Sequence, residues 1–361
     1  MANNSLESVL NIVRPEVRRE KAYHVGVPKN IEVKLNQNEN PFPLPDALQK
    51  RFTEILGDLS VNRYPAEFPD KLIATIADVE SFDPDGIIVG HGSNELSHFI
   101  ALCFLGTETN VVLPRPMFAL YKSVVRLFGA GLTEVPCKED LSFDVGRLID
   151  AIQRVKPALT VIASPNNPTG LVVGLSDIRR IVDASEGIVV LDEAYIEFVP
   201  EASAQMLLNE HPNLILLRTM SKAFGMAGLR IGYLVGHPSL VFEMKKARLP
   251  FMIGKHDELC AIELLKSSDL ISQWILEMRN QTDWMWNRVD EIDGVKAYPT
   301  RANFFLFETQ RDPAQLADSL GAMKIAVRKM SSYPELATML RVCAGTRNEN
   351  QRFVDALKRC I

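Results

Sequence analysis

The stretch Ile188-Val189-Val190-Leu191-Asp192-Glu193 is a run of apolar residues that ends in two acids. A strand that is apolar at every position is buried on both faces, as in a sheet that helices cover on both sides. Five more runs of this kind lie at residues 86–89, 111–113, 159–163, 214–217 and 231–235, and the segments between them are long enough for crossover helices, as at 93–105 and 117–128. The sequence therefore predicts an α/β fold with a large domain over residues 45–265, whose central sheet is mostly parallel and covered by helices.

The sequence pattern changes after residue 265, where a second, smaller unit is predicted. A long helical pattern spans residues 269–292 and carries all three tryptophans. A candidate strand follows at 303–307, and Gly345 and Thr346 introduce a final helix at 348–359. We expect residues 266–361 to form a small α+β domain. Residues 1–44 are expected to form an N-terminal arm that also contributes to the small domain.

The composition of the 361-residue chain is that of a soluble globular protein, with 47% hydrophobic and 24% charged residues. Its formal charge of -5 gives no net basic field that would attract nucleic acid or an anionic membrane surface. Five scattered cysteines without a CxxC pair suggest neither a disulfide framework nor a metal site. The sequence shows no signal peptide and no apolar run of about 18 residues. We expect a cytoplasmic protein whose partners are small molecules or copies of itself.

Polar residues follow the predicted strands at their carboxyl ends, which is where open α/β sheets bind ligands. The four segments are Gly90-His91-Gly92-Ser93-Asn94, Ser164-Pro165-Asn166-Asn167-Pro168-Thr169-Gly170, Asp192-Glu193-Ala194-Tyr195 and Thr219-Met220-Ser221-Lys222. The first is a Gly-x-Gly turn before a helix, where backbone N–H groups and the helix dipole favour an anion such as phosphate. Taken alone, the same residues equally fit an ordinary turn with Ser93 as the helix cap.

Two nucleotide-binding interpretations of these segments are weaker. A dinucleotide-binding turn would have glycine where Glu95 stands, and no acidic residue follows a second strand at the spacing that a ribose requires. A strand that ends in Asp192-Glu193 is also how nucleotide hydrolases hold magnesium, but the chain contains no G-x-x-x-x-G-K-[ST] loop. The turn therefore favours a phosphate group, but neither a dinucleotide nor a nucleoside triphosphate.

Lys222, Asp192, Asn167 and Tyr195 form a set that suits an aldehyde cofactor with a pyridine ring. A lysine amine condenses with an aldehyde, and the ring withdraws electrons while its nitrogen stays protonated, which a nearby carboxylate favours. A phenol and an amide beside the ring's oxygen would orient the ring. Each residue alone has an ordinary explanation as a cap, a turn or a solvated charge. Their joint occurrence at three strand ends favours a functional role.

The stretch Ser221-Lys222-Ala223-Phe224-Gly225-Met226-Ala227-Gly228-Leu229-Arg230-Ile231-Gly232-Tyr233 resembles the lysine signature of fold-type-I aminotransferases, with an arginine eight residues after the lysine. Together with Asn166-Asn167-Pro168-Thr169-Gly170 and Asp192-Glu193-Ala194-Tyr195, the resemblance covers nearly the whole chain. Within that family the chain looks most like the histidinol-phosphate aminotransferase branch, through residues 35–41, 62–65, 193–198, 340–342 and 345–347. The resemblance implies an aspartate aminotransferase-like fold and the cofactor pyridoxal 5'-phosphate (PLP).

The resemblance also implies a catalytic role for each matching residue. Lys222 would hold the PLP aldehyde as a Schiff base and, once freed by substrate, carry a proton between the substrate carbon and C4′ of the cofactor. Asp192 would pair with the ring nitrogen, and Asn167 and Tyr195 with the ring oxygen. Phe118 would stack on the ring.

Further residues match positions that bind the cofactor phosphate and the substrate in this family. The residues expected around the phosphate are Ser93, Asn94, Thr219, Ser221 and Arg230. Tyr64 would reach the phosphate in the other subunit, which implies a homodimer with shared active sites. Arg341 would bind the substrate carboxylate, Arg328 would lie near the substrate phosphate, and Tyr23 would close over it.

The resemblance implies transfer of the amino group of L-histidinol phosphate to 2-oxoglutarate, giving imidazole-acetol phosphate and glutamate. Aromatic amino acid transamination and threonine-phosphate decarboxylation use the same residues and remain alternatives. A PLP-binding regulator or a catalytically silent homologue is an alternative of another class. Regulators of this family carry a helix-turn-helix domain before the aminotransferase-like part, and the segment before Leu35 has no room for one.

Overall fold

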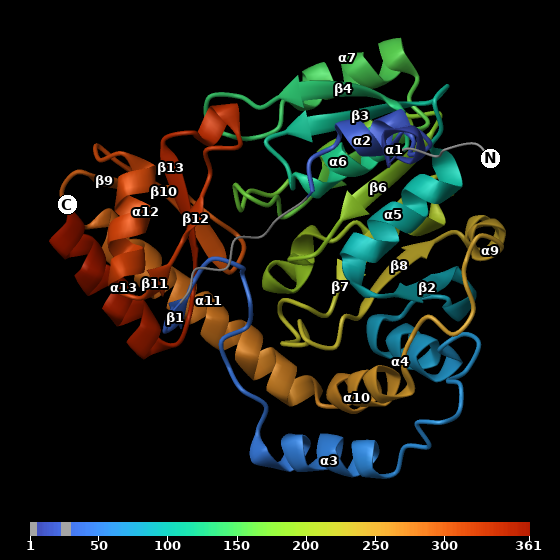
Figure 1. The fold of residues 1–361 in the computed structure, drawn as a ribbon, viewed down its shortest axis with the longest axis horizontal. Coiled ribbons are helices and arrows are strands. Elements are labelled where there is room, and N and C mark those ends of the chain that lie inside the picture. The colour runs from blue at the N-terminus through green and yellow to red at the C-terminus, as the bar shows by residue number, and fades with distance from the viewer. Residues whose placement is uncertain (1–5, 23–29) are drawn as a thin grey trace.

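The structure is a computed structural model that describes residues 6–22 and 30–361. Its largest sheet has seven strands in the order β2-β8-β7-β6-β5-β3-β4 (Figure 1). The strands from β7 to β4 are parallel to their neighbours, whereas β8 is antiparallel to both β7 and β2. The predicted α/β fold with a mostly parallel sheet is confirmed.

Six strands of this sheet coincide with the six apolar runs of the sequence. The seven strands of the sheet are β2 (Ile87–Gly90), β3 (Asn110–Arg115), β4 (Gly131–Pro136), β5 (Leu159–Ala163), β6 (Ile188–Asp192), β7 (Leu214–Thr219) and β8 (Gly232–Gly236), and all but β4 match an apolar run. The sequence did not predict β4, because it is an edge strand with polar Thr133 and Glu134 at half-buried positions. A strand of this kind lacks the continuous apolar run of a central one.

Helices cover both faces of the sheet. One face carries α5 (Gly92–Phe104), α6 (Leu120–Leu127) and α9 (Pro238–Lys245), and the other carries α4 (Asp70–Glu80), α7 (Val145–Val155), α8 (Leu175–Asp183) and α10 (Lys255–Leu265). Successive residues of a strand enter opposite cores, so Val190 packs on one side while Val189 and Leu191 pack on the other. Burial of each side chain of this size stabilises the folded state by about 1.5–3 kcal/mol relative to leaving it exposed to water. Two covered faces therefore require apolar residues at every strand position.

A second sheet lies beside the first and has the strand order β12-β13-β10-β9 (Figure 1). It consists of β9 (Val295–Ala297), β10 (Phe304–Thr309), β12 (Arg328–Lys329) and β13 (Met339–Cys343), accompanied by α11 (Ser268–Asp290), α12 (Pro313–Ala322) and α13 (Arg347–Cys360). The predicted long helix, strand and final helix are confirmed. Thr346 caps α13 in a capping box with Glu349. The domain limits at residues 44 and 265 stay predictions.

The N-terminal part of the chain contacts both units. It contains α1 (Leu6–Leu10), α2 (Pro15–Arg19), β1 (Val33–Lys34) and, further along, α3 (Asp46–Gly57). β1 pairs in parallel with β11 (Ile325–Ala326) of the C-terminal unit, whereas α2 contacts α6 and α3 contacts α10. Short 3₁₀ helices span Pro84–Gly86, Ile196–Phe198, Pro200–Ala202, Gln205–Asn209 and Pro334–Leu336. Within the described ranges, no helix is long and apolar enough to cross a membrane.

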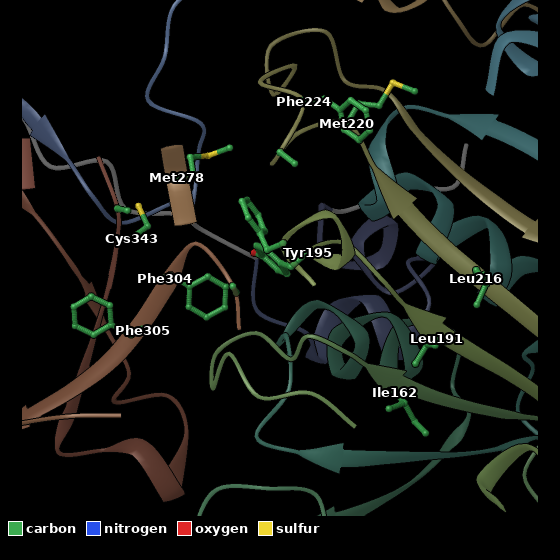
Figure 2. Packing of buried hydrophobic residues seen from close by; sticks show 14 of the residues in the cluster. Ile162, Leu191, Tyr195, Leu216, Met220, Phe224, Met278, Phe304, Phe305 and Cys343 are labelled. Atoms are coloured by element: carbon green, nitrogen blue, oxygen red, sulfur yellow. The ribbon is translucent and has the colours of Figure 1, made fainter. Parts of the chain in front are cut away.

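The cores of the two sheets are continuous. Tyr195, just after β6, packs edge-on against Phe304 of β10 with 5.0 Å between ring centroids (Figure 2). Both side chains belong to one buried cluster that also includes Cys343 of β13 and Met278 of α11. The polar carboxyl ends of the large sheet therefore face the small sheet across a packed apolar base.

Candidate active site

The strand register brings the polar segments together at one edge of the large sheet. Ala163 at the end of β5 pairs with Asp192 at the end of β6, and β7 lies next to it. Gly232 at the start of β8 pairs with both Thr219 and Gly90. The carboxyl ends of β2, β5, β6 and β7 therefore meet at one place, as the sequence predicted.

Lys222 lies in the turn after β7, and its amine donates a 2.8 Å hydrogen bond to the backbone carbonyl of Gln37. The amine is 5.9 Å from the ring centroid of Tyr195. Burial lowers the pKa of Lys222 to about 8, and the positive charge of Arg341 contributes to the same shift. A fraction of the amine is therefore neutral near pH 7, with a lone pair that can attack a carbonyl carbon.

The hydroxyl of Tyr195 accepts hydrogen bonds from two side-chain amides. Nδ2 of Asn38 lies at 3.0 Å and Nδ2 of Asn167 at 3.4 Å. Oδ1 of Asn167 accepts a hydrogen bond from Arg341, which orients the amide. Burial raises the pKa of Tyr195 to about 12, so the phenol keeps its proton and can donate it to a ligand. No role was predicted for Asn38 from the sequence. The alternation of asparagine at positions 36, 38 and 40 was the pattern that could have indicated one.

The carboxylate of Asp192 accepts two hydrogen bonds at the end of β6. The donors are the hydroxyl of Tyr121 at 2.6 Å and the backbone N–H of Ala194 at 3.0 Å. Burial raises the pKa of Asp192, and these two hydrogen bonds act in the opposite direction. The sequence did not single out Tyr121. Tyr121 comes three residues after Phe118, a spacing that places both side chains on one side of the predicted helix. That spacing could have indicated a role for Tyr121.

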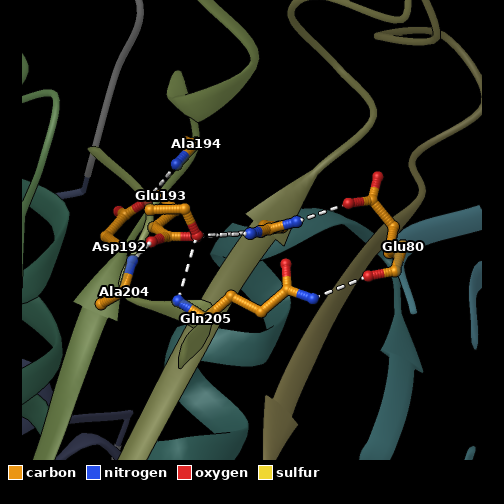
Figure 3. A network of polar contacts seen from close by, with 8 residues as sticks. Glu80, Asp192, Glu193, Ala194, Ala204 and Gln205 are labelled. Carbon is orange, nitrogen blue, oxygen red and sulfur yellow. Dashed lines mark hydrogen bonds and ion pairs between the residues drawn. The ribbon is translucent and has the colours of Figure 1, made fainter. Parts of the chain in front are cut away.

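The residue after Asp192 anchors the same strand end (Figure 3). Glu193 is fully buried and accepts hydrogen bonds from Nε of Arg218 at 2.9 Å and from the backbone N–H of Ala204 at 2.8 Å. Arg218 also forms a 2.7 Å ion pair with Glu80. Breaking a buried pair leaves an uncompensated charge, so this network holds the turn after β6 in place.

Arg230 lies against the Gly-x-Gly turn that follows β2. Gly92 has a φ of +77°, and a Cβ placed there would lie 2.5 Å from Nη2 of Arg230. The guanidinium donates a 3.1 Å hydrogen bond to the hydroxyl of Ser221. The backbone N–H of Ser221 in turn donates to the hydroxyl of Thr219 at 3.2 Å. The structure thus brings together the residues that the sequence predicted around a phosphate.

Ser93 and Asn94 lie in the first turn of α5, which begins at Gly92. The capping position belongs to His91, whose side chain makes no cap hydrogen bond. The interpretation of Ser93 as the helix cap is therefore wrong. The first N–H groups of an α-helix have no partner within the helix, so this end suits an anion.

Arg328 and Arg341 are direct cross-strand partners in the antiparallel pair of β12 and β13. Arg341 is buried and donates a 3.0 Å hydrogen bond to the backbone carbonyl of Asn36. Its Nε has no hydrogen-bond partner among the described residues. Burial lowers the pKa of Arg341, and the charge of Arg328 adds to this effect. Like charges directly opposite destabilise a strand pair, so this arrangement indicates a negatively charged ligand.

Two of the three remaining predicted residues lie within the described part of the chain. Phe118 is half-buried and packs edge-on against Tyr121, with 6.5 Å between ring centroids. Tyr64 is 82% exposed and stacks on Phe251 at 4.8 Å. Its contact with a second subunit stays a prediction. Tyr23 lies outside the described residues.

The sequence is similar to curated proteins over nearly its full length. It is 36% identical to the histidinol-phosphate aminotransferase of Chlorobaculum tepidum over 351 residues, which cover 96% of this chain and 100% of that protein. It is 34% identical to the histidinol-phosphate aminotransferase of Caldanaerobacter subterraneus subsp. tengcongensis over 354 residues, with 97% and 99% covered.

Solved structures share the fold at lower sequence identity. Histidinol-phosphate aminotransferase from Sinorhizobium meliloti, in complex with PLP, superposes with a TM-score of 0.87 at 24% identity, covering 96% of each chain. A Thermus thermophilus aspartate aminotransferase mutant gives a TM-score of 0.76 at 22% identity, with 93% and 99% covered. The fold is therefore the aspartate aminotransferase-like fold type I. Because residues 30–357 also match the family described as aminotransferase class I and II, this chain belongs to that family.

Proposed function

We propose that the protein transfers the amino group of L-histidinol phosphate to 2-oxoglutarate with PLP as cofactor, a reaction of histidine biosynthesis. The products are imidazole-acetol phosphate and glutamate. Membership of the aminotransferase family supports the reaction type. The shared name of relatives that are 34–36% identical supports the substrate.

The residues at the sheet edge fit PLP, whose protonated pyridine ring withdraws electrons from the carbon that bears the substrate amine. Asp192 presents an oriented carboxylate for the ring nitrogen. Tyr195 and Asn167 present donors for the ring oxygen. Gly92 keeps open the space beside Arg230 that a side chain would fill, which suits a phosphate.

We assign the remaining cofactor contacts to the neighbouring residues. Phe118 would stack on the ring. The phosphate would be held by Ser93, Asn94, Thr219, Ser221 and Arg230, with the arginine as a bidentate charge partner.

Lys222 is the proposed covalent anchor and proton carrier. Its lowered pKa provides a neutral amine for the aldehyde of PLP. The free amine of Lys222 would carry a proton between the substrate carbon and C4′ of the cofactor. Tyr195, close to this amine, holds its own proton for the ring oxygen.

The observation that carries the substrate assignment is the pairing of Arg328 with Arg341 across two strands. L-Histidinol phosphate carries a phosphate and 2-oxoglutarate carries two carboxylates, and both must occupy the site in turn. Guanidinium groups bind phosphate and carboxylate alike through paired hydrogen bonds. An anion at this place would relieve the repulsion between the two arginines. Tyr23 would close over the bound substrate.

We further propose that the protein works as a cytoplasmic homodimer with shared active sites. Tyr64 and its stacking partner Phe251 are 82% and 43% exposed, and such an aromatic surface suits contact with a second copy. Tyr64 would then reach the cofactor phosphate bound to the other subunit. The proposed units are the arm at 1–44, the large domain at 45–265 and the small domain at 266–361.

Single-turnover spectroscopy tests the substrate. The PLP-loaded protein is mixed with L-histidinol phosphate without 2-oxoglutarate, and the visible absorption of the bound cofactor is followed. We expect rapid loss of that absorption as the cofactor takes up the amino group, and its return when 2-oxoglutarate is added. A protein that reacts with phenylalanine, tyrosine or tryptophan but not with histidinol phosphate would contradict the assignment. Release of carbon dioxide from threonine phosphate would indicate a decarboxylase.

A variant pair tests the arginine assignment. Arg328→Met is expected to lower kcat/KM for L-histidinol phosphate by about tenfold or more, because a charge-assisted pair with the phosphate is lost. Arg359→Met, at an exposed position of α13, is the matched control and should leave kcat/KM unchanged. Equal values for both variants would mean that Arg328 does not bind the substrate.

A further inference from the structure

A carboxylate lies inside the turn that the proposed function assigns to the cofactor phosphate. Oε2 of Glu95, in the first turn of α5, accepts the backbone N–H of His91 at 3.2 Å. A Cβ at Gly90 would lie 2.4 Å from that oxygen, so the carboxylate fills the inside of the turn. The Glu95 side chain is 28% exposed and is therefore partly shielded from water. Its charge alone would repel a phosphate at the same helix end.

Arg248 is the charge partner of Glu95. It follows α9, forms an ion pair with Oε1 of Glu95 and donates a 3.0 Å hydrogen bond to the backbone carbonyl of Val89. Its guanidinium lies over the ring of Phe99, 5.0 Å from the centroid. Val89 belongs to β2 and Phe99 to α5, so Arg248 contacts both elements that flank the turn.

The burial of Arg248 distinguishes this pair from the surface ion pairs of the protein. Only 4% of its side chain is exposed, against 41% and 52% for the two partners of the pair Arg179 and Glu210. Exposed pairs contribute about 0–1 kcal/mol and are weakened by salt. A buried arginine beside a partly shielded carboxylate acts at a lower effective dielectric, where its charge has a larger effect on its neighbours.

We propose that Arg248 is a positioning residue for the cofactor phosphate. It cancels the charge of Glu95, so that Glu95 can accept the N–H of His91 and shape the turn without repelling the phosphate. The inference rests on the proposed function only in placing the phosphate of PLP at this turn.

Cofactor binding to the apoprotein tests this role without any measurement of turnover. PLP is titrated into the wild-type protein, Arg248→Met, Glu95→Gln and the double variant, and the dissociation constant is read from absorbance. Arg248→Met is expected to bind PLP about tenfold more weakly, the effect of one uncompensated charge. Glu95→Gln keeps an acceptor for His91 and removes the charge, so its affinity should not fall. The double variant should recover most of the affinity lost in Arg248→Met.

The PLP affinities of the two single variants distinguish charge compensation from a purely structural role of the ion pair. If the pair only holds the turn in shape, both single variants bind PLP more weakly and the double variant is no better, which would overturn the proposal. Pyridoxal, which lacks the phosphate, should bind all four proteins with similar affinity. Equal losses for pyridoxal and PLP would also overturn it.

Two controls keep the result interpretable. Arg179→Met removes an exposed arginine from an ion pair on α8, which covers the opposite face of the large sheet from α5, and should bind PLP as the wild type does. Circular dichroism and thermal unfolding establish that each variant is folded before titration. If the wild-type protein binds PLP no more tightly than pyridoxal, the phosphate placement in the proposed function fails. If it prefers PLP and Arg248→Met is unchanged, only the present inference fails.

Discussion

The side-chain amide of Asn38 donates a 3.0 Å hydrogen bond to the hydroxyl of Tyr195, 157 residues further along the chain. The backbone carbonyl of Asn38 accepts a 3.3 Å hydrogen bond from Asn303, which directly precedes β10. One residue of the N-terminal segment therefore contacts both the end of β6 and the small sheet. Because Tyr195 already accepts this bond, its own proton is left for the ligand.

Removal of the Asn38 amide should change the acid–base behaviour of the bound cofactor. Asn38 has a φ of +55°, which glycine adopts freely, so Asn38→Gly deletes the amide without backbone strain. Tyr195 then becomes a weaker donor to the anionic ring oxygen. We expect the pKa read from the visible absorption of the bound cofactor to rise, by up to about one unit. An unchanged pH titration would mean that Asn38 acts only on stability.

Lys222 should make cofactor capture depend on pH. Its pKa of about 8 means that the neutral amine becomes more abundant as the pH rises towards that value. The rate at which the apoprotein takes up PLP should rise roughly tenfold per pH unit below about 8 and level off above it. Stopped-flow absorbance measures this rate. A rise that continued towards pH 10 would show that burial does not lower the pKa of the lysine.

Lys222→Ala should abolish turnover and covalent attachment of PLP while the protein stays folded. Lys246→Ala is the control, because Lys246 is exposed and its amine contacts Glu243 and the ring of Phe242 on the surface. Mass spectrometry after borohydride reduction detects the attached cofactor. Turnover retained by Lys222→Ala would contradict the central assignment.

In Tyr121→Phe, the weakening of PLP binding at acid pH should begin at a higher pH than in the wild type. Burial raises the pKa of Asp192, and the hydrogen bond from Tyr121 lowers it. Loss of that bond raises the pKa of Asp192 further. As the pH falls, Asp192 of the variant is therefore protonated at a higher pH than in the wild type and no longer pairs with the ring nitrogen. The PLP dissociation constant, measured as a function of pH, should begin to increase earlier in the variant. Superimposable curves would exclude this role of Tyr121.

Arg218→Met should destabilise the fold strongly. It leaves the buried carboxylate of Glu193 without its charge partner, a change that typically costs about 3–5 kcal/mol. Arg179→Met breaks an exposed pair and should cost less than about 1 kcal/mol. Urea unfolding gives both free energies. Similar values would show that the Glu193 network does not hold the strand end.

The sequence predicted the strand ends well because burial on both faces leaves a strong signal. A sheet covered by helices requires apolar runs, and the polar residues that interrupt them at Asp192 and Thr219 mark the edge where ligands bind. The edge strand β4 escaped prediction because its half-buried positions accept polar residues. The hydrophobic pattern of the sequence thus predicted the central strands of the sheet but not its edge strand β4.

The residues that orient the site were harder to foresee. Asn38, Tyr121 and Arg248 act through partners 157, 71 and 153 residues away. No local pattern encodes such a distance, because each contact exists only after the sheet and its helices have packed. A single sequence can therefore reveal which residues are chemically suited to a ligand, but not which ones hold them in position.

The contacts of residues 36–38 also carry a consequence for biogenesis. The carbonyl of Asn36 accepts a hydrogen bond from Arg341, and that of Gln37 accepts one from Lys222. A segment that leaves the ribosome early thus finds Lys222 only after more than half of the chain has been synthesised, and Arg341 only after almost the whole chain. Contacts of such long sequence separation form late in folding. Capture of the cofactor should therefore be a post-translational event, and a truncated or incompletely folded chain should remain an apoprotein.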